Sequence, residues 1–100
     1  MMGIRLAGLL LLLILISPGG ASAAQLQLDW RDRSFNESGF LILRQIVRVG
    51  PMSPIATVGQ NITTYTDTGL SPGTKYCYRV LAFNVAGNSK LSKKACRKAH

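Results

Sequence analysis

The 100-residue sequence predicts an all-β fold in which antiparallel strands form a sandwich or a barrel. Two observations carry this prediction. After residue 24, no stretch repeats its apolar residues with the period of about 3.6 residues that marks an amphipathic helix. Instead, short runs rich in β-branched and aromatic residues follow one another about 8–12 residues apart, with turns rich in Gly, Pro and Asn between them.

The first 23 residues have the composition of a secretory signal peptide. A short basic segment ends at Arg5, residues 6–16 are apolar, and a small-residue cleavage site ends at Ala23. The alternative is a retained membrane anchor, but a spanning helix needs about 20 apolar residues and this run is much shorter. We expect cleavage after Ala23 and a secreted, periplasmic or cell-surface location. Of 100 residues, 77 would remain, and loss of Arg5 would change the net charge from +8 to +7.

The expected strands begin directly after the cleavage site. Residues 25–30 alternate polar and apolar side chains, as a half-buried strand does. Residues 40–46 begin a β-rich run, which is followed by Pro51 and Pro54, residues that cannot donate to a strand ladder. Further strands are expected at residues 55–58, 63–68, 74–83 and 89–97, with loop 84–88 closing a hairpin between the last two.

Three local patterns together resemble a fibronectin type III domain over residues 25–98. Trp30 ends an early strand, after Leu26 and Leu28. Leu70, Pro72 and Tyr76 lie in a segment similar to the tyrosine corner, in which a tyrosine hydroxyl bonds to backbone a few residues upstream. Residues 76–89 resemble the last hairpin of the family.

The resemblance implies an immunoglobulin-like sandwich with fibronectin type III topology, whose two sheets are A-B-E and C′-C-F-G. Strand B would be 25–30, C 40–46, C′ 55–58, E 63–68, F 74–83 and G 89–97. A strand A has no place after Ala23. Either residues 17–24 are retained as a short strand A, or strand B is an open edge that invites pairing with another chain.

Cys77 and Cys96 are expected to form a disulfide. A hairpin that turns at Ala86 and Gly87 places the two cysteines directly across the ladder, and an exported protein meets an oxidising compartment. Two free thiols are the alternative. Because Tyr76 and the even-numbered residues after it form the inward set, the disulfide would lie on the solvent face as a covalent staple.

The same register predicts a binding face on the outside of the C-F-G sheet. It places Arg79 opposite Lys94 and Lys75 opposite Lys98, so that like charges meet unless an anionic partner or solvent separates them. A second group of outward residues, apolar in character, would form an interface patch on this face: Leu41, Leu43, Leu81 and Phe83. The alternatives for that patch are partial cover by long side chains such as Arg79, or a strand register that differs by one residue.

The expected function is an exported interaction module that binds another protein or itself through this face and the open edge. The alternative is binding of an anionic surface polysaccharide or another polyanion through the basic residues Lys75, Arg79, Lys90, Lys94 and Lys98. Salt distinguishes the two, because polyanion binding weakens steeply as ionic strength rises.

We expect no enzymatic activity and no metal, cofactor, small-molecule substrate or specific nucleic acid. The one histidine is the terminal His100, and no nucleophile–base pair or phosphate loop can be assembled. Asp67 is expected to bond backbone or hydroxyl groups at a sheet edge. Asn36 and Asn61 match the glycosylation pattern but are interpreted as ordinary turn residues, because the sequence resembles bacterial members of the family.

Overall fold

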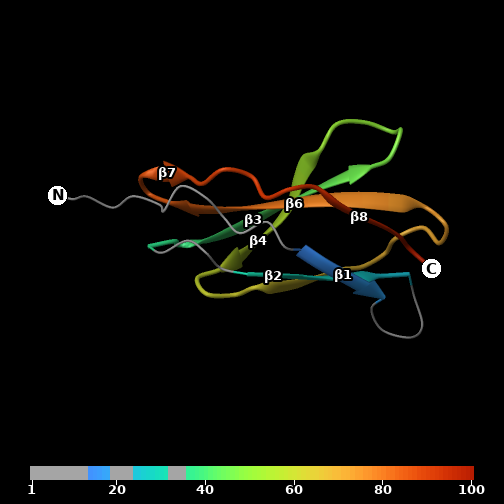
Figure 1. The fold of residues 1–100 in the computed structure, drawn as a ribbon, viewed down its shortest axis with the longest axis horizontal. Coiled ribbons are helices and arrows are strands. Elements are labelled where there is room, and N and C mark those ends of the chain that lie inside the picture. Colours follow the sequence, from blue (N-terminus) through green and yellow to red (C-terminus); the bar gives the residue numbers. More distant parts are fainter. Residues whose placement is uncertain (1–13, 19–23, 32–35) are drawn as a thin grey trace.

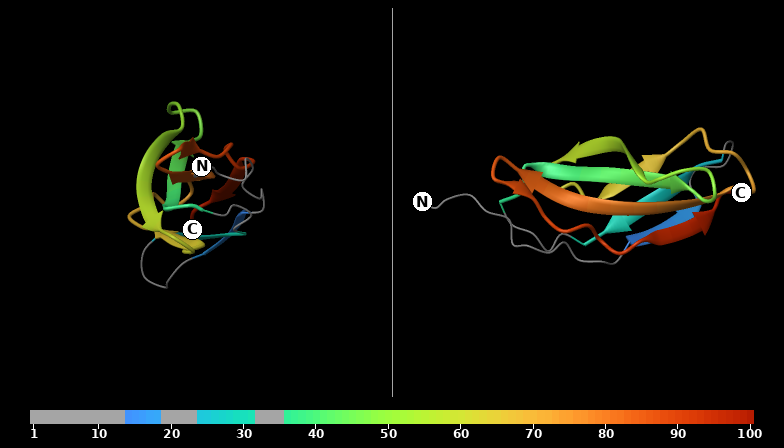
Figure 2. Two further views of the ribbon diagram at one scale, coloured as in Figure 1. Left: turned by 90° about the vertical axis from the view of Figure 1, so that its left-hand side faces the viewer. Right: turned by 90° about the horizontal axis from the view of Figure 1, so that it is seen from above.

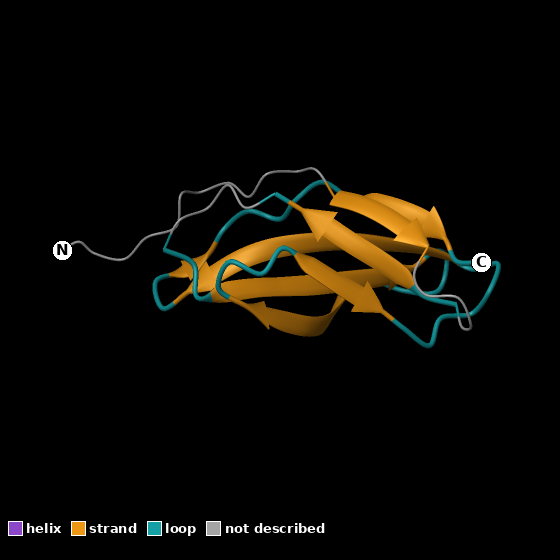
Figure 3. Cartoon of the chain, turned by 90° about the horizontal axis from the view of Figure 1, so that it is seen from below, coloured by secondary structure: helices purple, strands orange, loops and turns teal. Residues whose placement is uncertain are grey.

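The computed structural model describes residues 14–18, 24–31 and 36–100. All regular structure in these residues is β, in two facing antiparallel sheets (Figures 1 and 3). One sheet has the order β1-β2-β5, with bounds Ile14–Pro18, Leu26–Trp30 and Thr64–Asp67. The other has the order β4-β3-β6, and β6 pairs with both β7 and β8; its bounds are Gly39–Ile46 for β3, Ser53–Gly59 for β4, Lys75–Asn84 for β6, Gly87–Asn88 for β7 and Ala95–Lys98 for β8.

The two-sheet sandwich predicted from the sequence is confirmed, and most strands lie close to their expected places. Strands B, C, E and F correspond to β2, β3, β5 and β6. Strand C′ is longer than expected, because β4 includes Pro54. A proline is tolerated there since β4 is the outermost strand of its sheet and needs only one set of partners. No helix in the described part of the chain is long and apolar enough to span a membrane.

The core forms where the alternating apolar residues of the two sheets meet. Leu28 of β2, Phe40 and Ile42 of β3 and Tyr78 of β6 are fully buried. Trp30 meets Phe40 edge to face, with ring centroids 5.7 Å apart. Burying each such side chain stabilises the fold by about 1.5–3 kcal/mol. This packing determines which face of the β4-β3-β6-β8 sheet is left to solvent.

A strand A exists, and it begins three residues before the segment expected to form it and overlaps that segment at residues 17 and 18. Neither sequence alternative placed a strand at Ile14–Pro18, which pairs antiparallel with β2. Ile16 packs against the core, and Arg97 Nη1 of β8 donates to the Ile16 carbonyl at 3.3 Å. β1 therefore lies beside β8 where the two sheets meet (Figure 2). Of the retained strand expected at residues 17–24, only 17 and 18 belong to β1, and residues 19–23 lie outside the described chain.

The single last strand expected at residues 89–97 is wrong: only its last part belongs to a strand, β8 at Ala95–Lys98, while the short β7 at Gly87–Asn88 lies in the expected loop 84–88. The hairpin turns at residues 85–86, one position earlier than expected. Phe83 pairs with Asn88 and Cys77 with Cys96, so the returning chain holds two more residues than β6 between these pairs. Hydroxyl groups cause the interruption: the Ala82 and Val80 N–H groups donate to Oγ of Ser89 and Ser92, each at 2.9 Å.

Candidate interaction surface

The tyrosine corner predicted from the sequence is present. The Tyr76 hydroxyl accepts a hydrogen bond from the Ser71 N–H at 2.9 Å. Leu70 is buried and its N–H donates to the carbonyl of Ala24, while Pro72 lies exposed in the turn. These contacts tie the loop between β5 and β6 to the start of β2, and they set the point at which β6 begins.

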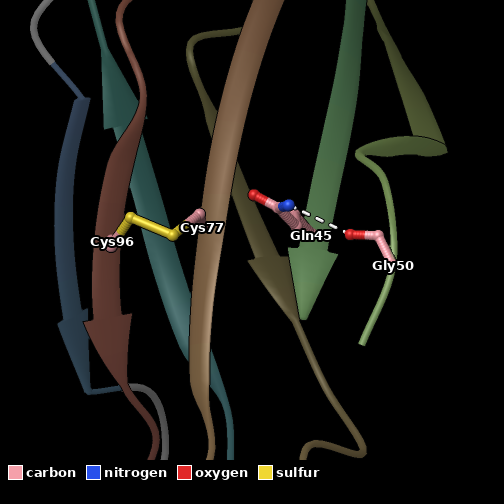
Figure 4. The surroundings of a disulfide bond; sticks show 4 residues. All are labelled: Gln45, Gly50, Cys77 and Cys96. Atoms are coloured by element: carbon pink, nitrogen blue, oxygen red, sulfur yellow. Dashed lines mark hydrogen bonds between the residues drawn. A yellow bond between two sulfur atoms is a disulfide. The ribbon is translucent and has the colours of Figure 1, made fainter. Parts of the chain in front are cut away.

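The expected disulfide is also present, between β6 and β8. Cys77 and Cys96 lie directly opposite each other with Cα atoms 4.0 Å apart. On the other side of β6, Gln45 of β3 pairs with Cys77, and its Nε2 donates to the Gly50 carbonyl at 3.0 Å (Figure 4). Cys77 itself is buried and Cys96 is exposed. The disulfide thus connects strands on the outer face of the sheet.

We define the outer face as the solvent side of β3, β6 and β8, where the predicted apolar patch also lies. Leu41 pairs with Leu81 across β3 and β6, but Leu81 is only 8% exposed and the other three residues of the patch are half-buried. The expectation of four openly exposed apolar groups is therefore wrong. Phe83 is half-buried because its ring packs closely over Gly39. A Cβ at that position would lie 3.0 Å from the Phe83 ring and would collide with the Val58 carbonyl.

The concave part of the outer face lies beside this patch. An open pocket of about 320 Å³ lies there, lined by Leu43, Gln45, Met52, Arg79, Leu91 and Lys94. Leu43, Arg79 and Lys94 were predicted as binding residues, and the structure brings them together. Leu41, Leu81 and Phe83 do not line it. Met52 and Leu91 were missed by the sequence analysis.

Leu91 reaches the pocket because the last strand is interrupted. In an unbroken strand with Cys96 outward, odd-numbered residues would face the core and Leu91 would be buried. One extra residue between Ser89, which bonds to Ala82, and Ser92, which bonds to Val80, reverses this assignment locally, so that Ser92 is fully buried and Leu91 is 39% exposed. The second extra residue restores the original alternation before Cys96. Ser89 and Ser92 were the sequence signal for this interruption, because serine hydroxyls compete with backbone carbonyls for the N–H groups of a neighbouring strand. For Met52, between two prolines, the sequence carried no comparable signal.

The outer face is basic, and none of the described carboxylates lies on it. Lys75 pairs with Lys98 across β6 and β8, as expected. Lys94 lies before β8 and so does not pair with Arg79 in the strand ladder, but both residues line the pocket. The acids are engaged elsewhere. Glu37 and Asp67 are buried, and Asp29 on β2 accepts from Gln27 Nε2 at 3.1 Å. Uncompensated cations beside an apolar pocket favour an anionic ligand group there.

A buried polar network joins the two sheets beneath this face. Asp67 of β5 accepts a hydrogen bond from the Tyr78 hydroxyl at 2.6 Å. Both of its carboxylate oxygens also accept from Arg44 Nη1, each at 3.0 Å. The sequence analysis expected Asp67 to bond a hydroxyl group, as it does with Tyr78, but it did not predict the ion pair with Arg44. Arg44 also lies 5.7 Å from the centroid of the Tyr76 ring. Burial alone would lower the pKa of Arg44, but the hydrogen bond and charge of Asp67 raise it overall.

The network makes stability depend on alkaline pH through Tyr78. Burial first, and then the hydrogen bond and charge of Asp67, raise the pKa of Tyr78 well above its ordinary value. Its stabilising contribution is therefore complete below the unfolded-state pKa of about 10 and declines as pH rises above it, at a limiting slope of about 1.4 kcal/mol per pH unit.

Tyr78→Phe should remove this part of the pH dependence. Wild-type protein should exceed the variant in free energy of unfolding by a margin that shrinks by about 1.4 kcal/mol between about pH 9 and about pH 11, which urea titrations of both proteins would measure. A margin that stays constant over this range would contradict the assignment. Because the two proteins differ only at residue 78, the margin between them isolates the contribution of Tyr78.

The described residues hold no cluster of three or more His, Cys, Asp or Glu side chains that could bind a metal ion. The described residues thus combine a two-sheet sandwich, a tyrosine corner, a disulfide between β6 and β8 and a pocket on the outer face. A search of curated proteins found no match.

Solved structures and a family description do match. An Fn3-like protein from Clostridium thermocellum is 29% identical, with a TM-score of 0.68 and 83% of each chain covered. The protein of a structure titled "Myokine structure" is 22% identical, with a TM-score of 0.70, covering 86% of this chain and 90% of that one. A beta-1,2-glucanase from Parabacteroides distasonis is 18% identical, with a TM-score of 0.71, covering 96% of this chain but 13% of the enzyme.

The family model of the fibronectin type III domain matches residues 17–96. Domains of this family are typically non-catalytic and commonly mediate protein interactions. Its match begins inside the expected signal peptide, in agreement with a strand A that starts before Ala23. Since this match spans most of the sequence and the sandwich has the sheet order that the resemblance implied, the chain belongs to the fibronectin type III domain family.

Proposed function

We propose that the chain is an exported, non-catalytic interaction module that binds an acidic segment of a partner protein through the outer face. The carrying observation is the pocket in which Leu43, Met52 and Leu91 lie beside Arg79 and Lys94. The disulfide supports export, because such bonds persist in oxidising compartments. The secreted, periplasmic or cell-surface location follows from this proposal.

The size and chemistry of the pocket suit a protein segment better than a free small molecule. At about 320 Å³ it lies at the lower limit of small-molecule sites, and it is open to solvent. One apolar side chain can fill it while a neighbouring carboxylate reaches Arg79, whose planar guanidinium binds carboxylates with two parallel hydrogen bonds. An apolar residue next to Asp or Glu is therefore the expected recognition unit.

Polyanion binding is the second candidate, and the pairing of Lys75 with Lys98 favours it. In that case the basic residues of β6 and of the chain from Lys90 to Lys98 would contribute similarly to the binding of the polyanion: Lys75, Arg79, Lys90, Lys94 and Lys98. The ligand would be an anionic surface polysaccharide or a similar polymer. Its contacts would not require the apolar wall formed by Leu43 and Leu91.

Two double variants with equal charge change separate the candidates. Peptides selected from a random displayed library on the wild-type protein should carry an acidic residue beside an apolar one. Arg79→Glu with Lys94→Glu should weaken binding of such a peptide by at least about tenfold, since two desolvated charge contacts become repulsive. Lys75→Glu with Lys98→Glu makes the same change beyond the disulfide and should leave binding within about twofold. Fluorescence anisotropy measures both.

Dextran sulfate serves as the polyanion probe in the same assay. If the outer face is a general polyanion site, both double variants lose dextran sulfate binding equally, and the affinity falls steeply with salt. Leu91→Ser should weaken peptide binding several-fold without affecting dextran sulfate. Equal peptide binding by wild type, the Arg79 and Lys94 double variant and Leu91→Ser would overturn the proposal.

A further inference from the structure

Strand β1 lies inside the leader that the sequence analysis expects to be cleaved after Ala23. β1 covers Ile14–Pro18, and cleavage after Ala23 would detach it from the domain. We infer that removal of the leader frees the edge of β2, and that β2 of a second copy then pairs with it in an antiparallel, two-fold symmetric dimer. This inference rests on the proposed export and cleavage, but not on the proposed ligand of the outer face.

The hydrogen-bonding groups that cleavage would expose can be identified. The Trp30 N–H donates to the Thr63 carbonyl, and the Leu28 carbonyl accepts from the Thr64 hydroxyl, so these groups face β5. Backbone groups alternate in direction along a strand, and those of Gln27 and Asp29 therefore face β1. Without β1 they form an open edge, which readily adds a strand from another chain.

The register of β1 on β2 shows why a second β2 fits this edge. Ile16 pairs with Leu28 and reaches the core. A two-fold axis at Leu28, perpendicular to the sheet, keeps the inward face of both strands on the same side. The partner's Leu28 then takes the place of Ile16, one branched aliphatic side chain replacing another. Leu26 lies opposite the partner's Trp30, so that apolar residues meet along the whole inward side.

The outward side of the same pairing is also complementary. Gln27 lies opposite the partner's Asp29, and the symmetry axis repeats this pair. Within one chain Gln27 Nε2 already donates to Asp29, at 3.1 Å to one carboxylate oxygen. Across the dimer the same amide and carboxylate face each other as directly opposed residues of an antiparallel ladder, where side chains interact most strongly. The cations of the outer face lie on the solvent side of the other sheet, and the one basic side chain of β8 that reaches this edge is Arg97, whose Nη1 donates to the Ile16 carbonyl at 3.3 Å.

The test uses the full-length chain, produced with its own leader in a secreting host. The intact mass of the exported protein should show that it begins at Ala24, and light scattering after gel filtration should give the mass of a dimer. Gln27→Asp places a carboxylate opposite the partner's Asp29 twice and should raise the dimer dissociation constant by roughly tenfold. Gln27→Lys should lower it by a similar factor, because both contacts become ion pairs.

Gln60→Asp is the matched control, because it makes the same substitution in an exposed turn away from β2. It should leave the dissociation constant unchanged. An Ala24 product that is monomeric, or a dimer insensitive to both Gln27 variants, would overturn the inference. An exported product that retains residues 14–18 would also overturn it, because β1 then keeps its place, yet export and peptide binding by the outer face would stand. Failure of peptide binding by a dimer with the expected Gln27 responses would contradict only the outer-face proposal.

Discussion

Asp67→Ala should lower the free energy of unfolding by about 3 kcal/mol. The substitution leaves the Tyr78 hydroxyl and the Arg44 guanidinium without the acceptor that both use. Tyr78 is fully buried and cannot recover its hydrogen bond from water. The side chain of Arg44 is 27% exposed, so solvent offsets part of its loss and the expected effect stays below that of a fully buried ion pair. Urea denaturation followed by the fluorescence of Trp30 measures the change.

Asp67→Asn is the control for this prediction. Its amide oxygen still accepts from Tyr78 while the charge opposite Arg44 is gone, and the loss should be about half as large. A loss below about 1 kcal/mol for Asp67→Ala would show that the network does not join the sheets energetically.

Removing the disulfide should cost a similar amount. Cys77→Ala with Cys96→Ala opens a loop of 19 residues in sequence separation and should lower the free energy of unfolding by about 3 kcal/mol in the chain-entropy model. A domain of this size has a total stability of about 4–12 kcal/mol, so the loss is a large fraction of it. Urea titrations with and without reductant provide the measurement.

The reductant supplies its own control. It should destabilise the wild-type protein by about the same amount as the double substitution, and it should leave the double variant unchanged. Wild-type stability that does not respond to complete reduction would show that the disulfide is a passive feature of the outer face.

Local patterns were sufficient for most of the framework. Period-two alternation around Leu26 and Leu28 predicted β2, because only alternate residues of a half-buried strand reach the core. The tyrosine corner depends on residues 70–76 alone and is formed as expected. The pairing of Cys77 with Cys96 was also right, although the hairpin turns one residue earlier than expected. The two extra residues after β7 restored the register at the cysteines.

The candidate site was predicted only in part, because it depends on that irregularity. An unbroken last strand would bury Leu91, and the pocket would lose one wall. Whether a serine hydroxyl or a backbone carbonyl accepts from Val80 is decided by how the chain packs against β6, which alternation alone does not describe. For the same reason Arg44 was missed: its partner Asp67 lies 23 residues away, on the other sheet.

Strand pattern, turn chemistry and cysteine content are local properties, and they were sufficient for the fold class, the family resemblance and the staple. Contacts between distant segments decided the rest: the face to which Leu91 belongs, the partner of Asp67, and the pairing of residues 14–18 with β2. That last segment shows the physical reason most clearly. An apolar run such as residues 6–16 has the composition of a leader and of a buried strand alike, and only an open edge on β2 gives its final residues a place in the sheet.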